Sequence, residues 1–81
     1  MEDVRIKIEE IYVPAKWRTT IEPAKVESLA ESILESGQQS PISVRKGNNR
    51  FVLVSGVHRL EAMKALGEDS IAAVVVGSPQ H

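Results

Sequence analysis

Residues 42–66 read as a strand, a tight turn, a second strand and a helix that follow one another without a linker. Residues 42–45, Ile-Ser-Val-Arg, fit a short strand after Pro41, and apolar residues dominate 50–54. The Lys-Gly-Asn-Asn segment at 46–49 between them carries residues that favour a hairpin turn. A helical pattern begins directly afterwards and runs over 57–66. This order is typical of an α+β domain in which helices cover a small mixed β-sheet.

The rest of the chain supplies two more strands and a second main helix. Val4 to Ile8 alternates apolar and polar residues, as a half-buried strand does. Residues 70–76 are apolar enough for a strand that is buried on both faces. Pro23 suits the first position of a helix and Gly37 its end, which predicts a helix over 23–36. Residues 9–20 show no regular pattern.

Apolar side chains of these elements form the predicted core. The stripe of the 23–36 helix that should cover the core consists of Val26, Leu29, Ala30, Ile33 and Leu34. Together with the strands and the other helix, this predicts a core that includes Val26, Leu29, Ile33, Val52, Val54, Leu60 and Val74.

The chain has 81 residues, a net charge of −1 and no cysteine. Its length predicts one domain over residues 1–76 and a loose tail over 77–81. The longest apolar run, 71–76, is too short to span a membrane, and the acidic first residues lack the pattern of a signal peptide. We therefore expect a cytoplasmic domain without a membrane partner. Because DNA-binding domains usually carry a basic excess, we also expect little affinity for DNA.

The polar side of the 23–36 helix is divided into two flanks of different chemistry. At 100° per residue, Glu27, Glu31 and Glu35 lie together on one flank, which is acidic. The other flank consists of the hydrogen-bond donors Lys25, Ser28 and Ser32. Serine is a modest helix former, so two serines beside a lysine are an unusual choice for an exposed helix face. This row can bind acceptor oxygens, or its serines are ordinary solvated surface.

The junction between the hairpin and the second helix is suited to bind an anion. Ser55 and Gly56 end the strand, and His58 and Arg59 lie in the first helical turn, where unpaired N–H groups and the positive end of the helix dipole are exposed. Arg59 falls within the apolar arc that should face the protein, where a charge needs a partner. That partner is either a carboxylate of the fold or an anion from solution. A lone histidine is usually structural, but the neighbours of His58 make it a candidate contact.

If the N-terminal ends of both helices converge on one sheet, these donors line a single cleft. A set of donors without acceptors suits a polyphosphate or a nucleotide. The sequence has no Walker-type glycine loop, no nucleophile elbow and no cluster of His and Cys at metal spacing. Its two histidines, His58 and His81, are too far apart to suggest a zinc site.

Over nearly its whole length the chain resembles the ParB/sulfiredoxin superfamily. The segment SLAESILESGQQSPISVRK (28–46) is similar to the ParB N-terminal pattern of a helix, Gly, Gln and Pro-apolar-x-Val-Arg. The segment SGVHRLEAMKALGEDSIAAVVV (55–76) is similar to the second ParB box, with Gly-Val-His-Arg where ParB has Gly-Glu-Arg-Arg. The resemblance implies a ParB/sulfiredoxin-like fold.

The segment PAKVESLAESI (23–33) also resembles the first helix of sulfiredoxin, whose Lys, Ser and Thr contact ATP phosphates. Sulfiredoxin's Gly-Cys-His-Arg falls on 56–59, so Val57 stands in place of the catalytic cysteine, which excludes the reductase chemistry. Free-serine kinases of the same superfamily carry His-His-Arg, of which His58 and Arg59 match the second His and the Arg.

The resemblance implies a bound nucleoside triphosphate, ATP or CTP, with Mg²⁺ carried by the nucleotide rather than by the protein. Arg18 is a further candidate for contact with the base or the γ-phosphate. The complete set of candidate phosphate- and nucleotide-binding residues is Arg18, Lys25, Ser28, Ser32, Gly56, His58 and Arg59.

Hydrolysis or transfer of the nucleotide stays open at this point. A phosphotransferase needs a carboxylate near the γ-phosphate, and the nearest by sequence are Glu9, Glu10 and Glu22. The alternative is a non-catalytic accessory or regulatory module for partition, transcription or another DNA-linked process. Both functions are compatible with a homodimer or with a partner protein.

Overall fold

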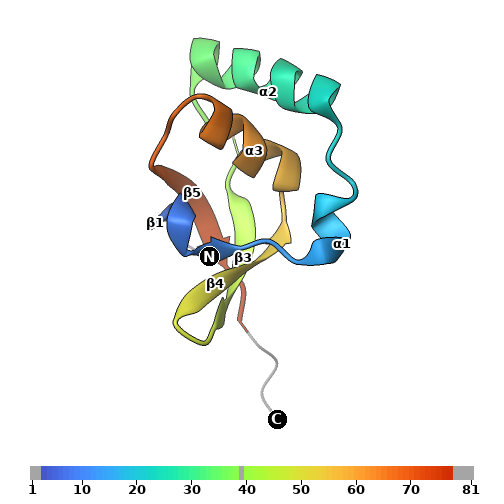
Figure 1. Cartoon of the computed structure of the whole chain (residues 1–81). Coiled ribbons are helices and arrows are strands. Elements are labelled where there is room, and N and C mark those ends of the chain that lie inside the picture. Colours follow the sequence, from blue (N-terminus) through green and yellow to red (C-terminus); the bar gives the residue numbers. More distant parts are fainter. Residues whose placement is uncertain (1–2, 39, 78–81) are drawn as a thin grey trace.

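The computed structural model describes residues 3–38 and 40–77. Within them, five strands form one mixed sheet in the order β1-β5-β3-β4-β2 (Figure 1). The strands are β1 (Asp3–Lys7), β2 (Ile11–Tyr12), β3 (Ile42–Gly47), β4 (Arg50–Ser55) and β5 (Ser70–Val75). The helices are α1 (Ala15–Arg18), α2 (Pro23–Ser36) and α3 (Val57–Ala65), and Ile8–Glu10 forms a 3-10 turn, η1. The predicted α+β fold is confirmed.

The sheet combines parallel and antiparallel pairs. β5 pairs with β1 in antiparallel and with β3 in parallel orientation, while β4 pairs with β3 in antiparallel and with β2 in parallel orientation. The helix α3 contacts β3 and β5, and α2 packs on α3, on the side away from the sheet (Figure 1). The hairpin and the helix that follows it therefore form the centre of the fold.

Apolar side chains between the sheet and α3 form the core. The largest fully buried side chains come from β3, β4, β5 and α3: Ile42, Val44, Leu53, Leu60 and Ile71. Of the predicted core residues, Ile33, Leu60 and Val52 are buried, and Val26, Leu29 and Val74 are half-buried. Val52 lies on the opposite face of the sheet from Leu53, because successive side chains of a strand alternate.

Two predicted core positions are wrong. Val54 is 36% exposed, because the β3–β4 register shifts next to it: Ser43 pairs with Ser55, and Val44 pairs with Leu53. This β-bulge leaves Val54 unpaired on the open face of the sheet. Leu34 is 76% exposed. It lies about 100° around α2 from Ile33, past the edge of the stripe that packs on α3.

The strand and loop predictions also need correction. β5 is fully buried on one face only, since Ile71 and Ala73 are buried while Ser70, Ala72 and Val74 are half-buried. Residues 9–20 are not irregular throughout, because they contain part of η1, the strand β2 and the helix α1. These elements have four residues or fewer, too few to produce a recognisable period.

Gln38 connects the end of α2 to the sheet. Its side-chain amide donates to the carbonyl of Ala72 over 3.0 Å, and its side-chain oxygen accepts from the N–H of Ala72 over 2.9 Å. The same amide donates to the carbonyl of Ser40 over 2.8 Å. The side chain thus extends the ladder of β5 beside Pro41, which has no N–H to contribute.

The bounds of the two main helices agree closely with the prediction. α2 begins at Pro23 and ends before Gly37, as predicted, and α3 ends one residue before the predicted Leu66. Gly77, the first residue of the predicted tail, is exposed and belongs to no helix or strand, and 78–81 lie outside the described residues. No helix within 3–38 and 40–77 is long and apolar enough to cross a membrane.

Candidate functional site

Gly56 forms the tight junction between β4 and α3. It is the N-cap of α3, with a left-handed backbone (φ 101°, ψ 31°), and its carbonyl accepts the first helical hydrogen bond from Leu60 over 2.9 Å. A Cβ at this position would lie 2.7 Å from Cγ2 of Ile42. Both the backbone angle and the lack of space therefore require glycine here. No side chain of the described residues caps the helix, so the N–H groups of its first turn are available to an anion.

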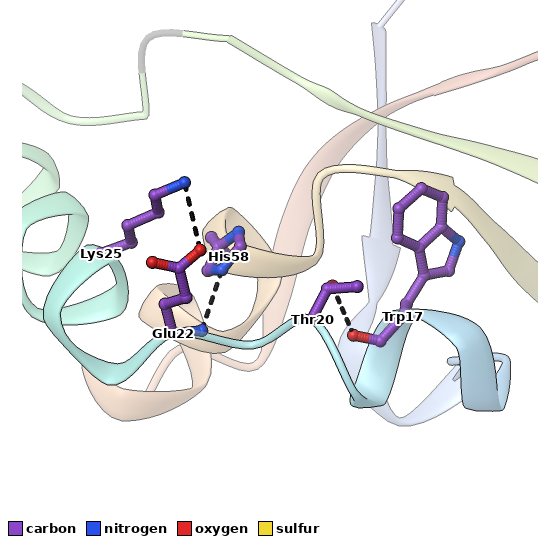
Figure 2. A network of polar contacts seen from close by, with 5 residues as sticks. All are labelled: Trp17, Thr20, Glu22, Lys25 and His58. Atoms are coloured by element: carbon purple, nitrogen blue, oxygen red, sulfur yellow. Dashed lines mark hydrogen bonds and ion pairs between the residues drawn. The ribbon is translucent and has the colours of Figure 1, made fainter.

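His58 joins the N-terminal ends of the two main helices. The backbone N–H of Glu22, the N-cap of α2, donates a hydrogen bond to Nε2 of His58 over 3.0 Å (Figure 2). An accepting Nε2 places the proton of a neutral imidazole on Nδ1. The expected convergence of the two helix N-termini is thus present.

The charged groups at this junction are mostly cationic. Arg59 is half-buried, and no hydrogen bond or ion pair involves it within the described parts of the chain. The sequence had left open an ion pair between Arg59 and a carboxylate of the fold. No such ion pair occurs in the described residues. Lys25 is paired with the exposed carboxylate of Glu22 over 3.4 Å.

These residues line one pocket of about 460 Å³. This volume is within the range of small-molecule sites. Its charged lining residues come from the start of α2 and of α3, and further lining residues come from α1, the loop after it, α2 and the β4–α3 junction. The full lining is Trp17, Thr20, Glu22, Lys25, Leu29, Ser55, Gly56, Val57, His58 and Arg59. A neighbouring hollow of about 410 Å³ shares Lys25, Leu29 and His58 and adds Ala24 and Ser28.

The structure brings together five of the seven candidate residues. Lys25, Gly56, His58 and Arg59 line the pocket, and Ser28 lines the neighbouring hollow. Ser32 lies one helical turn farther along the donor flank of α2 and is in neither lining. Arg18 is also in neither, and its Nε donates to the carbonyl of Val13 over 3.0 Å. Of the three candidate carboxylates, Glu22 lines the pocket, while Glu9 and Glu10 line hollows elsewhere.

Sequence reasoning missed the wall opposite the cations. It is formed by Trp17 and Thr20, which lie beside each other where α1 ends, with the Thr20 hydroxyl donating to the Trp17 carbonyl over 2.8 Å (Figure 2). The indole N–H of Trp17 is buried and has no partner in the described residues. The isolated tryptophan among the polar residues of 16–20 was the one available signal.

Among the described residues, the pocket lacks the ligand set of a metal centre. No group of three or more His, Cys, Asp or Glu side chains that could hold a metal ion occurs in the described ranges. Free amides, an unpaired arginine and a lysine are instead the donors that bind phosphate oxygens.

Comparison with known proteins identifies the family of the chain. The family model of the ParB N-terminal domain matches residues 1–81. The chain belongs to the ParB N-terminal domain family. A probable chromosome-partitioning protein ParB from Campylobacter jejuni is 42% identical over 62 residues, which cover 76% of this chain. The match covers 22% of that relative, so the chain corresponds to about a fifth of its length.

Two solved structures share the fold. Sulfiredoxin from Arabidopsis thaliana aligns with a TM-score of 0.86 at 29% identity, over 96% of this chain and 88% of its own. A C-terminally truncated chromosome-partitioning protein ParB from Caulobacter crescentus, complexed with CTP-γ-S, aligns with a TM-score of 0.81 at 25% identity, over 99% of this chain and 47% of its own. The superfamily expected from the sequence is confirmed.

Proposed function

We propose that this ParB N-terminal domain binds a nucleoside triphosphate, with the phosphates at the N-terminus of α3. The observation that carries the proposal is Arg59, a half-buried arginine that lines the pocket beside the uncapped first turn of α3 and has no carboxylate partner in the described residues. Guanidinium groups bind phosphate through two parallel hydrogen bonds, so an anion from solution is a matching partner.

The other candidate residues contact different parts of the nucleotide. Gly56 lets the backbone come close to the phosphates, and His58 offers Nδ1–H because its Nε2 already accepts from Glu22. Lys25 binds a phosphate after it leaves Glu22, a small cost because both side chains are exposed. Ser28 extends the site along α2. Ser32 and Arg18 contact only those parts of the nucleotide that reach beyond the pocket.

CTP is the first nucleotide to test, since the Caulobacter relative was solved with CTP-γ-S, and ATP is the second. Mg²⁺ enters with the triphosphate, since the pocket offers Glu22 as its one carboxylate in the described residues. By its family, the domain serves chromosome partition or another DNA-linked process, with nucleotide as its ligand.

Calorimetric titration with CTP, ATP, GTP and CDP, each with Mg²⁺, tests this proposal. We expect one triphosphate to bind in preference to the others and to compete with inorganic triphosphate, which carries the phosphates alone. Binding of none of the four nucleotides by a folded protein would refute the proposal.

Glu22 favours a second step, phosphoryl transfer or hydrolysis, because it is the one of the three sequence-selected carboxylates that lies at the pocket. The test compares phosphate release from the bound triphosphate by the wild type and by Glu22→Gln. Turnover that the variant loses supports a catalytic role. Binding without turnover in both proteins supports the alternative, a non-catalytic module that uses the nucleotide as a regulatory ligand.

A further inference from the structure

The two edge strands of the sheet lie closer together than a flat sheet allows. β1 ends at Lys7 and β2 begins at Ile11, and only η1 lies between them. The four steps from Lys7 to Ile11 span at most about 14 Å. In a flat sheet of the order β1-β5-β3-β4-β2, the two edges would lie about 19 Å apart. Because Ile8 of η1 packs against the core, the sheet is curled toward the core, and its inner face is concave.

The helix α3 covers only part of this concave face. Val44 and Leu60 are fully buried in the cluster that joins the sheet to α3. Nearer to the β3–β4 hairpin, Phe51 and Val75 are only half-buried, and Val4 is 40% exposed. In Figure 1, the segment from β1 to α1 crosses the sheet below α3, so this end of the inner face lies beyond the helix.

A hollow of about 590 Å³ lies at this uncovered end, and we refer to it as the sheet hollow. Its lining comes from β1, η1, β3, β4 and β5: Val4, Arg5, Ile6, Lys7, Glu10, Lys46, Phe51 and Val75. It shares no lining residue with the pocket at the start of α3. Mouths of curled sheets are a frequent place for small-molecule sites, which combine apolar walls with a few polar groups.

The ionic groups of the sheet hollow leave cations in excess. Arg5 donates to the hydroxyl and to the carbonyl of Ser70 over 3.0 and 3.3 Å, so its guanidinium is engaged on β5. Lys7 and Lys46 are exposed, and no hydrogen bond or ion pair involves them within 3–38 and 40–77. Glu10 is the one carboxylate of the lining and is also unpaired there. Two available ammonium groups thus stand against one carboxylate.

Lys46 and Phe51 place a cation beside the apolar wall. They are partners in the β3–β4 register, so their side chains lie on the same face of the sheet. The ring of Phe51 is half-buried and continues the wall formed by Val4 and Val75. A ligand with an apolar body and an anionic end complements both residues at once.

We propose that the sheet hollow binds a small amphipathic carboxylate. Its apolar body lies on Val4, Phe51 and Val75, and its carboxylate pairs with Lys46. The concave shape and the volume suit a small molecule better than the flat surface of a partner protein. Since the two sites have no residue in common, this binding does not depend on the proposed nucleotide.

Titration with hexanoate, octanoate and decanoate, followed by ¹H–¹³C NMR of the methyl groups, gives the first test. We expect saturable shifts confined to the signals of Val4, Ile6 and Val75. Because the chain is buried, the affinity should rise about three- to fourfold with each added CH₂. Octylammonium has the same apolar body and should bind at least about tenfold more weakly than octanoate. An affinity that does not depend on chain length, or shifts that are scattered over the surface, would refute the proposal.

Charge reversal provides the second test. Lys46→Glu changes an exposed side chain, so the fold should persist, and the variant should prefer octylammonium to octanoate. Arg45→Glu is the matched control, because it changes the net charge equally at the next residue of β3, which lies on the opposite face. It should keep the wild-type preference, and Glu10→Gln should strengthen the binding of octanoate.

Equal effects of Lys46→Glu and Arg45→Glu would contradict the proposal, since the attraction would then come from the overall charge. Binding of anionic lipid vesicles without saturable binding of the soluble carboxylates would also refute it, because the lysines would then serve a membrane surface. Circular dichroism and melting curves establish that each variant is folded.

Discussion

The N–H of Glu22 donates its hydrogen bond to Nε2 of His58 over 3.0 Å, and this contact fixes the N-terminal ends of α2 and α3 next to each other. Two consequences follow for the site. The donor flank of α2 faces the first turn of α3, and the remaining ring nitrogen of His58 is a donor. The pocket thus has its donor arrangement before any ligand binds.

The tautomer of His58 is the first testable prediction. In the neutral imidazole of the ligand-free protein, we expect the proton on Nδ1, because Nε2 accepts from the backbone N–H of Glu22. Long-range ¹H–¹⁵N correlation spectra distinguish the two tautomers, and the spectrum of His58→Ala assigns the signals. A dominant Nε2–H form would mean that this hydrogen bond is absent in solution.

Replacing Gly56 by alanine should strongly destabilise the fold. The left-handed backbone and the 2.7 Å approach to Cγ2 of Ile42 add up to a cost of about 2–4 kcal/mol in the free energy of unfolding. Gly67→Ala is the matched control. Gly67 also has a positive φ, of 79°, but a Cβ at this position would meet nothing within 4 Å, so its cost should be about 1–2 kcal/mol. Equal losses in urea titrations of both variants would contradict the close packing at Gly56.

Sequence patterns predicted the parts of this fold that depend on local chemistry. Pro23 and Gly37 marked the ends of α2, and Gly56 before His58 and Arg59 marked the tight junction for which we propose anion binding, because these residues act through their own backbone and charge. Val54 could not be placed, since its exposure depends on a β-bulge in the pairing of two strands. Leu34 is apolar, as core residues are, but α3 does not cover the side of α2 on which Leu34 lies.

The pocket residues, too, were predictable only where local sequence determines their position. The donors were found because they occur at helical spacing and in one short motif. Trp17 and Thr20 were missed as pocket residues because α1 approaches the junction only through tertiary packing. Conversely, Ser32 has the correct helical phase, but the lining of the pocket does not extend to its turn of α2.

Gln38→Ala should destabilise the protein by about 1–3 kcal/mol, because it leaves the amide and carbonyl of Ala72 without partners in a half-buried place. Ser40→Ala, at an exposed position two residues away, should stay within about 0.5 kcal/mol of the wild type. Hydrogen exchange gives a local readout, with faster exchange of the Ala72 amide in the Gln38 variant. Unchanged protection of that amide would show that the side chain does not form this clamp.

The isolated domain should bind duplex DNA weakly. At about 150 mM salt, we expect a dissociation constant no tighter than about 10 μM, because few phosphates can be neutralised at this net charge. Fluorescence anisotropy with a labelled duplex measures it. A nanomolar affinity for one sequence would contradict the prediction.

The measurement closest to the central claim combines nucleotide affinity and melting temperature in Arg59→Ala. Since no ion pair of Arg59 occurs in the described residues, the melting temperature should change little, while the affinity for the triphosphate should fall roughly ten- to a hundredfold, or about 1.5–3 kcal/mol. Arg45→Ala, at an exposed arginine outside the pocket, should keep the wild-type affinity. A loss of stability of about 3–5 kcal/mol in Arg59→Ala, with no nucleotide binding by the wild type, would instead identify Arg59 as a structural ion-pair partner and contradict the account.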